Sequence, residues 1–171
     1  KYNLEILGPE SEEDKIHFLT QTLVEKEQVV FGDEKINIIE TAGHTSGHIC
    51  YYFKQSNTLF SGDTLFAMGC GRLFEGTAED MFNAFQKLKS LPDKTLIYCG
   101  HEYTLSNGKF ALSVEPDNPD LITRMKDVQK LRSENIPTIP TNMALERKTN
   151  PFIRAKTAAE FKKLRELKDN F

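Results

Sequence analysis

Cysteine, long apolar runs and net charge are all scarce in this sequence, and each scarcity excludes a class of protein. Only three cysteines, Cys50, Cys70 and Cys99, occur among 171 residues, and no two of them form a Cys-x-x-Cys pair. An odd, widely spaced set argues against a disulfide framework and against a thiolate zinc site. We therefore expect buried thiols in a protein of the reducing cytoplasm.

No window of the chain reaches the roughly eighteen consecutive apolar residues that a membrane-spanning helix needs. The 22 basic and 25 acidic residues leave a net charge of −3, which provides no long-range attraction to nucleic acid or to an anionic membrane. We expect a soluble protein with neither of these as a partner. The chain begins at Lys1 rather than at Met, so we also expect that its natural start lies upstream.

Strand and helix patterns divide the chain into two parts. Up to about residue 103, short β-branched or aromatic runs are bounded by turn-forming residues: VVF, INIIET, ICYYF, TLFSG and TLIYC. One amphipathic helix interrupts them, beginning after the N-cap candidate Thr77 and stopped by Pro92. Beyond residue 104 the strand pattern disappears, and helical segments follow, joined by the proline-spaced stretch 136–154. We predict an α/β domain over residues 1–103 and an all-helical domain over residues 104–171.

Three potential metal ligands follow strands in the same way. His44 comes after INIIETAG, Asp63 after TLFSG and His101 after TLIYCG, each directly behind a glycine. In open α/β sheets, ligand sites lie beyond the carboxyl ends of strands, and a glycine at the bend lets the next side chain turn inward. Zinc takes imidazole and carboxylate ligands in catalytic sites, and a carboxylate can bridge two metals. The pattern predicts a metal site at these three residues.

Other interpretations of the histidines exist. A single histidine or aspartate at a strand end is usually a cap or a solvent-facing residue. His44 and His48 are also spaced as in a helical His-x-x-x-His zinc pair, although the intervening Thr-Ser-Gly and the β-rich flanks argue against a helix there. We assign His44 to the metal and His48 to positioning the loop. His17 has no comparable context and is expected on the surface.

Six segments occur in the order AGHTSGHICYY, FSGDTLFAMGCGRLFEGT, YCGHEYT, VEPDN, NPFIR and ELKDNF. Together they resemble the hydroxyacylglutathione hydrolases, the glyoxalase II family of the metallo-β-lactamase superfamily. The resemblance implies an αββα sandwich followed by an all-helical domain. It also implies hydrolysis of S-D-lactoylglutathione to D-lactate and glutathione, the detoxification of methylglyoxal, at a centre of two divalent metals. Zinc is the expected metal, and iron and manganese accept the same ligands.

The resemblance also implies roles for individual residues. His44 would bind the first metal, Asp63 would bridge both, and His101 would bind the second, so that these three carry the catalysis. Residues matching the family's glutathione contacts, with His101 beside them, are Arg72, Phe74, Tyr103, Arg165 and Lys168. Convergent cations suit a tripeptide with two carboxylates, and Arg165 and Lys168 share one helical face.

Three of these substrate contacts have plainer interpretations. The KKLRELK segment around Arg165 and Lys168 could equally be the solvated face of a terminal helix, and Tyr103 could pack in the core. Phe74 stands where some members of the family carry tyrosine. Its missing hydroxyl removes one hydrogen bond worth about 0.5–1.5 kcal/mol net.

The chain departs from the family in one respect. Members carry a His-x-His-x-Asp-His segment ahead of the region that this chain covers, and none occurs between Lys1 and His44. Each metal would then keep one histidine and a shared carboxylate, fewer ligands than zinc normally has. We expect the N-terminal part of the sandwich to be missing from this chain. An apolar sheet face would then be exposed, for the missing segment or another partner to cover.

Three hypotheses follow. The chain is the C-terminal part of a glyoxalase II, whose activity belongs to the complete protein. Alternatively, it is an inactive remnant that serves as a binding or oligomerisation module. In the third hypothesis, it belongs to another metallo-β-lactamase-fold hydrolase or to a persulfide dioxygenase, which would not be expected to carry a helical tail with Arg165 and Lys168.

Overall fold

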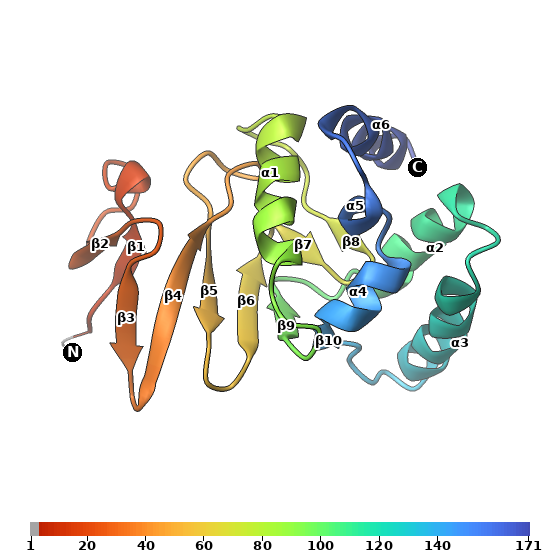
Figure 1. The fold of residues 1–171 in the computed structure, drawn as a ribbon, viewed down its shortest axis with the longest axis horizontal. Helices are drawn as coiled ribbons and strands as arrows, with labels where there is room; N and C mark the ends of the chain where they lie inside the picture. Colours follow the sequence, from red (N-terminus) through yellow and green to blue (C-terminus); the bar gives the residue numbers. More distant parts are fainter. Residues whose placement is uncertain (1–3) are drawn as a thin grey trace.

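A computed structural model describes residues 4–171, in which a six-stranded mixed sheet lies beside a group of helices (Figure 1). The strand order across the sheet is β10-β9-β6-β5-β4-β3. Its strands are β3 (Gln28–Phe31), β4 (Glu34–Glu40), β5 (Ile49–Phe53), β6 (Thr58–Gly62), β9 (Leu96–Cys99) and β10 (Thr141–Asn142). Within this six-stranded sheet only β6 and β9 pair in parallel, because helix α1 (Ala78–Lys89) forms the crossover between them.

Two small strand pairs accompany the main sheet. β1 (Leu7–Pro9) and β2 (Gln21–Leu23) pair in parallel, with the short 3-10 helix Glu10–Glu12 between them. β7 (Leu65–Phe66) and β8 (Gly69–Cys70) form an antiparallel hairpin directly after Asp63. The remaining helices are α2 (Thr104–Val114), α3 (Pro119–Ser133), α4 (Met143–Thr149), α5 (Pro151–Arg154) and α6 (Ala158–Asp169). No helix among residues 4–171 combines the length and apolar character needed to cross a membrane.

Local sequence explains where the elements begin and turn. Thr77 accepts a hydrogen bond from the Asp80 N–H, and the Asp80 carboxylate accepts one from the Thr77 N–H, so α1 starts with a capping box. Asn118 caps α3 through a single hydrogen bond, which its side chain accepts from the N–H of Leu121. Gly32 lies in the turn between β3 and β4 with φ 60°, a backbone conformation that favours glycine. The predicted strands, the hairpin turn and the helix after Thr77 are confirmed.

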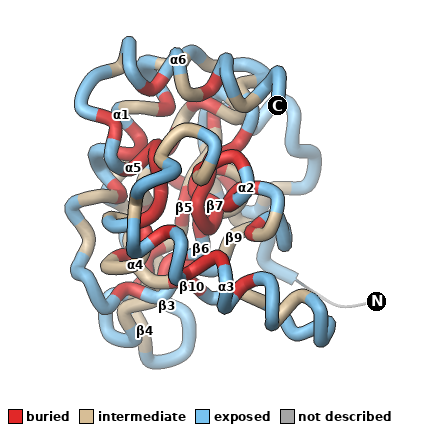
Figure 2. Tube along the Cα trace, turned by 90° about the vertical axis from the view of Figure 1, so that its right-hand side faces the viewer, coloured by how far each residue is buried: buried red, intermediate tan, exposed pale blue. Residues whose placement is uncertain are grey.

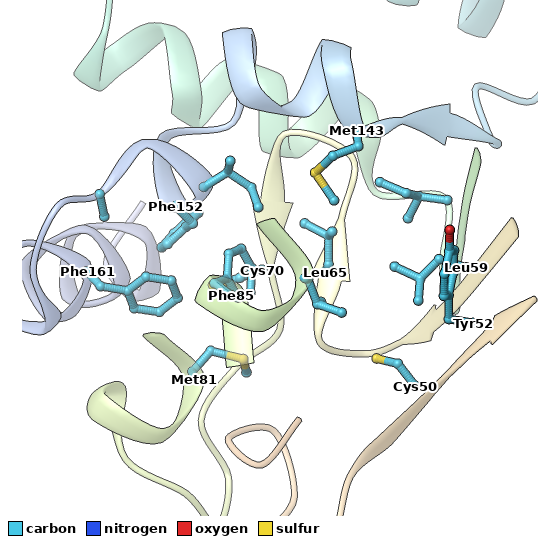
Figure 3. Close-up of a cluster of buried hydrophobic side chains, with 14 of the residues drawn as sticks. Cys50, Tyr52, Leu59, Leu65, Cys70, Met81, Phe85, Met143, Phe152 and Phe161 are labelled. Atoms are coloured by element: carbon cyan, nitrogen blue, oxygen red, sulfur yellow. The ribbon is translucent and has the colours of Figure 1, made fainter. Parts of the chain in front are cut away.

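The core lies between the sheet and the helices. Alternation along the strands turns Cys50, Tyr52, Leu59 and Ile97 toward α1, where they are buried with Phe85. Aromatic side chains of the helical part, including Phe152 and Phe161, complete this cluster (Figure 3). Figure 2 shows the buried segments gathered where the sheet, the β7–β8 hairpin and the helices meet. The two predicted parts of the chain therefore share one core, and the boundary at residues 103 and 104 stays a prediction.

The opposite face of the sheet is only partly covered. At one end, Leu23 of β2 is buried against Ile36 and Ile38 of β4. Across the rest of this face, aromatic rings form a continuous row with neighbouring centroids 5.4–6.4 Å apart: Phe31, Phe53, Phe60 and Tyr98. Phe31 is 72% exposed and Phe60 is 44% exposed. An exposed apolar sheet face was expected and is confirmed; that a partner covers it stays a prediction.

The helical character expected of the second half of the chain is confirmed, with one short exception. Within residues 104–171, the strand β10 pairs with β9, with Thr141 opposite Ile97. A two-residue strand is too short to show a periodic pattern. The proline-spaced stretch 136–154 also contains two helices, α4 and α5, which begin at the capping residues Asn142 and Asn150.

Truncating an aromatic side chain should lower the free energy of unfolding much more in the core than on the exposed sheet face. Phe85 is fully buried in the core, so we expect Phe85→Ala to lower the free energy of unfolding by about 3–5 kcal/mol. Phe31→Ala, on the exposed face, should lower it by less than about 1 kcal/mol. Urea unfolding curves measure both values. Equal losses would contradict this assignment of the core.

Candidate functional site

Three strand ends bring His44, Asp63 and His101 to one place. Each residue follows a glycine whose missing side chain leaves room for its surroundings. A Cβ on Gly62 would lie 2.7 Å from the Nε2 of His48, and a Cβ on Gly100 would lie 2.6 Å from Oδ1 of Asp63. Gly62 has a φ of 49°, in the left-handed region that favours glycine. The glycine before each predicted ligand is therefore a steric requirement.

The Asp63 carboxylate lies between the two imidazoles. Its Oδ2 is 3.5 Å from Nε2 of His44, and its Oδ1 is 3.4 Å from Nε2 of His101. These distances are longer than ordinary hydrogen bonds. Oδ1 is also buried and has no hydrogen-bond partner among the described residues. One imidazole facing each carboxylate oxygen, with one oxygen lacking a partner, fits the shared part of a site for two cations.

The number of potential metal ligands at this place is nevertheless small. Within residues 4–171, no group of three or more His, Cys, Asp or Glu side chains is arranged to hold one metal ion. His44, Asp63 and His101 together would supply one imidazole and one carboxylate oxygen to each of two ions. Since zinc sites normally have three or four protein ligands, these residues fit a bridged centre only as part of a larger ligand set.

Backbone contacts orient the His44 ring. Its Nδ1 lies 2.9 Å from the carbonyl oxygen of Arg72. Because a carbonyl only accepts, Nδ1 is the donor, so in the neutral ring Nε2 is the nitrogen with the lone pair, and it faces Asp63. This is the arrangement in which a histidine is prepared to bind a cation.

His48 takes no part in the pair of imidazoles at Asp63. Its Nε2 accepts the backbone N–H of Asp63 at 3.1 Å, while its Nδ1 lies 2.9 Å from Oγ1 of Thr41 and 3.0 Å from Oγ1 of Thr64. The ring is therefore neutral, with its proton on Nδ1. Burial lowers the pKa of His48, and the neighbouring His44 lowers it further. The predicted loop-positioning contact is present, and His17 is exposed as expected.

A cavity of about 690 Å³ opens beside Asp63. All eight residues predicted for the site line it: His44, Asp63, Arg72, Phe74, His101, Tyr103, Arg165 and Lys168. The prediction missed further lining residues, among them Phe66, Ser106, Asn107 and Phe171. Phe66 and Phe171 lie in the segments FSGDTLFAMGCGRLFEGT and ELKDNF but were given no role, and no pattern marked Ser106 or Asn107 of α2.

Arg165 and Lys168 do not lie on a solvated helix face. Arg165 is 4% exposed and donates from Nη1 to the carbonyl oxygen of Cys70 at 2.9 Å and from Nη2 to Asp169 at 2.9 Å. Lys168 is half-buried, with Nζ 4.9 Å from the ring centroid of Phe110. Burial lowers the pKa of Lys168, and Arg165 adds to this effect. The interpretation of this segment as a solvated end helix is wrong for both residues.

Aromatic rings form another part of the cavity wall. Tyr103 stacks on the His101 imidazole with centroids 4.8 Å apart, and it is 49% exposed, so its interpretation as core packing is wrong. Phe74 is exposed, and its ring centroid lies 4.8 Å from that of His44.

Cys70 also lines the cavity, but it is buried, and burial raises the pKa of its thiol to about 11. A thiol in this state is a poor nucleophile near neutral pH.

The contact between His48 and Asp63 predicts a stability effect. His48→Ala would remove the acceptor of the Asp63 N–H and a partner of two buried threonine hydroxyls. We expect the free energy of unfolding to fall by about 1–3 kcal/mol. His17→Ala, at an exposed position, is the control and should change it by less than about 0.5 kcal/mol. Urea unfolding measures both free energies, and an unchanged free energy of unfolding for His48→Ala would contradict the positioning role.

Comparison with known proteins assigns both parts of the chain to a family. Residues 9–101 match the family described as metallo-beta-lactamase superfamily, and residues 102–171 match the one described as hydroxyacylglutathione hydrolase C-terminus. The hydroxyacylglutathione hydrolase of Rhizobium etli is 48% identical over 185 aligned residues, which cover 100% of this chain and 72% of the relative. That of Rhizobium johnstonii is 51% identical over 155 residues, covering 91% and 60%.

Solved structures share the fold at lower sequence identity. The crystal structure of ETHE1 from Myxococcus xanthus has a TM-score of 0.67 at 23% identity and covers 95% of this chain and 57% of that one. The BLEG-1 B3 metallo-beta-lactamase has a TM-score of 0.62 at 18% identity and covers 89% and 66%. These similarities show the fold alone. The family is shown by the two family matches and by the sequence relatives, of whose length this chain spans 60–72%: the chain belongs to the hydroxyacylglutathione hydrolase family of the metallo-β-lactamase superfamily.

Proposed function

We propose that the protein containing this chain hydrolyses glutathione thioesters, S-D-lactoylglutathione in particular, to D-lactate and glutathione. The observation that carries the proposal is a single cavity lined by two chemically different groups. One group is the Asp63 carboxylate between two imidazoles, and the other is the pair of cations Arg165 and Lys168. The hydroxyacylglutathione hydrolase name of the relatives supports this assignment.

Two divalent metal ions would supply the Lewis acidity that activates water and polarises the thioester carbonyl. His44 and Asp63 would hold one ion, and His101 and Asp63 would hold the other. We propose that the remaining ligands belong to the part of the relatives that this chain does not cover. Zinc is the metal that we propose, with iron and manganese as alternatives, and we propose a cytoplasmic location for the protein.

The substrate would be held by the charged and aromatic wall of the cavity. Glutathione carries two carboxylates, and Arg72 and Lys168 provide cations that can meet them. The partial burial of Lys168 favours such a contact, because a bound carboxylate would stabilise the ammonium charge that burial destabilises. The thioester would then lie toward Asp63, beside the stacked rings of His101 and Tyr103.

No side-chain nucleophile is required. The Cys70 thiol is buried, and its pKa is about 11, while a thiolate leaving group departs without strong acid assistance. A persulfide dioxygenase is the less favoured function, because the match of residues 102–171 to the hydroxyacylglutathione hydrolase C-terminus includes the helix with Arg165 and Lys168. An inactive binding module is disfavoured by the convergence of all eight predicted residues on one cavity.

The bridging role of Asp63 is tested by Asp63→Asn. The amide would remove the negative charge that both ions share, so we expect loss of bound metal and a fall in kcat of roughly 100-fold or more. Metal content by elemental analysis and hydrolysis of S-D-lactoylglutathione measure the two effects in the complete protein. Asp33→Asn, in an exposed turn, is the control. Retained metal and turnover in Asp63→Asn would overturn the assignment.

Substrate binding is tested on α6. Lys168→Ala should raise KM by roughly 10–100-fold with little change in kcat, because a charge-assisted hydrogen bond contributes about 1.5–3 kcal/mol. Lys163→Ala, on the exposed side of the same helix, should leave both constants unchanged. Steady-state kinetics with S-D-lactoylglutathione provide the comparison. An unchanged KM for Lys168→Ala would exclude Lys168 from the glutathione site.

A further inference from the structure

The tip of the β7–β8 hairpin is enclosed by side chains of the helical part. The backbone N–H of Met68 donates to Oε2 of Glu146 at 2.8 Å, and Nδ2 of Asn107 donates to the carbonyl oxygen of Ala67 at 3.1 Å. Nδ2 of Asn150 donates to the carbonyl oxygens on either side of the turn, those of Phe66 at 3.2 Å and Gly69 at 3.1 Å. Helix side chains thus satisfy the polar backbone groups that a surface hairpin would present to water.

Glu146 is the centre of this arrangement. Its side chain is completely buried, and each carboxylate oxygen accepts two hydrogen bonds. Oε2 accepts from Met68 and from Asn150 Nδ2, while Oε1 accepts from Arg124 Nη2 and Thr141 Oγ1, both at 2.7 Å. The buried Arg124 guanidinium balances its charge. One carboxylate therefore joins α3, β10 and α4 to the hairpin.

The hairpin could not easily hold this position by itself. Its two strands have two residues each, so they form a short ladder. Met68 has a φ of 55°, a left-handed conformation that is uncommon for a residue with a side chain and persists only when its surroundings fix it. The Met68 side chain is fully buried in a cluster with Met125 and Leu121. Contacts at the tip, rather than strand pairing, hold the hairpin in place.

Both ends of the hairpin meet the candidate metal ligands. Asp63 lies just before β7, and the Gly71 N–H after β8 donates to the Thr64 carbonyl oxygen at 3.1 Å. The contact is close enough that a Cβ on Gly71 would lie 1.9 Å from the backbone oxygen of Asp63. The next residue is Arg72, whose carbonyl orients His44. A displaced hairpin would move the Asp63 backbone and the acceptor of His44 together.

We propose that Glu146 is a positioning residue of the active site. It does not line the cavity, and it acts through the hairpin to hold Asp63 and His44 in register. The helical part would then have a second role besides binding substrate, which is to set the geometry of ligands that the sheet carries. The effect on turnover rests on the proposed hydrolase function, whereas the effect on the hairpin does not.

Two double variants test this role in the complete protein. Arg124→Met with Glu146→Leu removes the buried charge pair and leaves Met68 without an acceptor. Arg124→Met with Glu146→Gln removes the same charges but keeps one carbonyl oxygen for the Met68 N–H. We expect kcat to fall by about 10–100-fold in the Leu variant, the range seen when an orienting contact of a metal ligand is lost, and to recover to within about threefold of the unaltered protein in the Gln variant. Leu23→Ala, a core truncation in the separate cluster with Ile36 and Ile38, which contains no hairpin residue, controls for lost stability and should keep its kcat.

Amide hydrogen exchange provides a readout that does not depend on turnover. The Met68 and Gly71 amides should exchange faster in the Leu variant than in the Gln variant, and in the unaltered protein Met68 should exchange only in the same opening event as the amides of α4. Equal kcat and equal exchange in the two double variants would overturn the proposal. If the Leu variant does not fold, local exchange of Met68 in the unaltered protein would still overturn it. Absence of thioester hydrolysis in the unaltered protein would refute the proposed function alone.

Discussion

Asp63 occupies a space that exists because three neighbouring residues, Gly62, Gly71 and Gly100, have no side chains. A Cβ on Gly100 would collide with the Asp63 carboxylate, one on Gly71 with its backbone oxygen, and one on Gly62 with the His48 ring that accepts the Asp63 N–H. An aspartate held this closely has little freedom to turn away from the two imidazoles. The cavity, the orientation of His44 and the packing of the hairpin all depend on this close approach.

The sheet and the helices contribute different chemistry to the same cavity. Strand ends supply His44, Asp63 and His101, whose backbone positions are fixed by strand pairing. The helical part supplies Arg165 and Lys168, and it also surrounds the hairpin that links Asp63 to Arg72. Because the two parts share one core, a change in either is expected to reach the site. This explains why a buried residue such as Glu146 can matter to a site that it does not touch.

Burial changes what the charged groups can do. Arg165 is nearly inaccessible and donates hydrogen bonds to the Cys70 carbonyl oxygen and to the Asp169 carboxylate. It therefore stabilises the wall of the cavity and adds positive charge to it. Lys168 is only half-buried and remains available to an anion. Arg165 and Lys168, three residues apart on one helix, therefore have different roles, because Arg165 is buried in the cavity wall and Lys168 is partly exposed in the cavity.

The sequence by itself determined the elements and the residues that meet at the candidate site. Short β-branched runs, the Thr77 cap and the glycine before each of His44, Asp63 and His101 are local features, so the strands, α1 and the convergence of these three residues could be predicted, and ordered motifs identified the family. Tertiary structure alone decided the rest. The pairing of β10 with β9, the burial of Arg165, and the enclosure of Met68 by Glu146 join residues 44 to 95 positions apart. No local pattern encodes such contacts, because they arise only when distant segments pack around a common core.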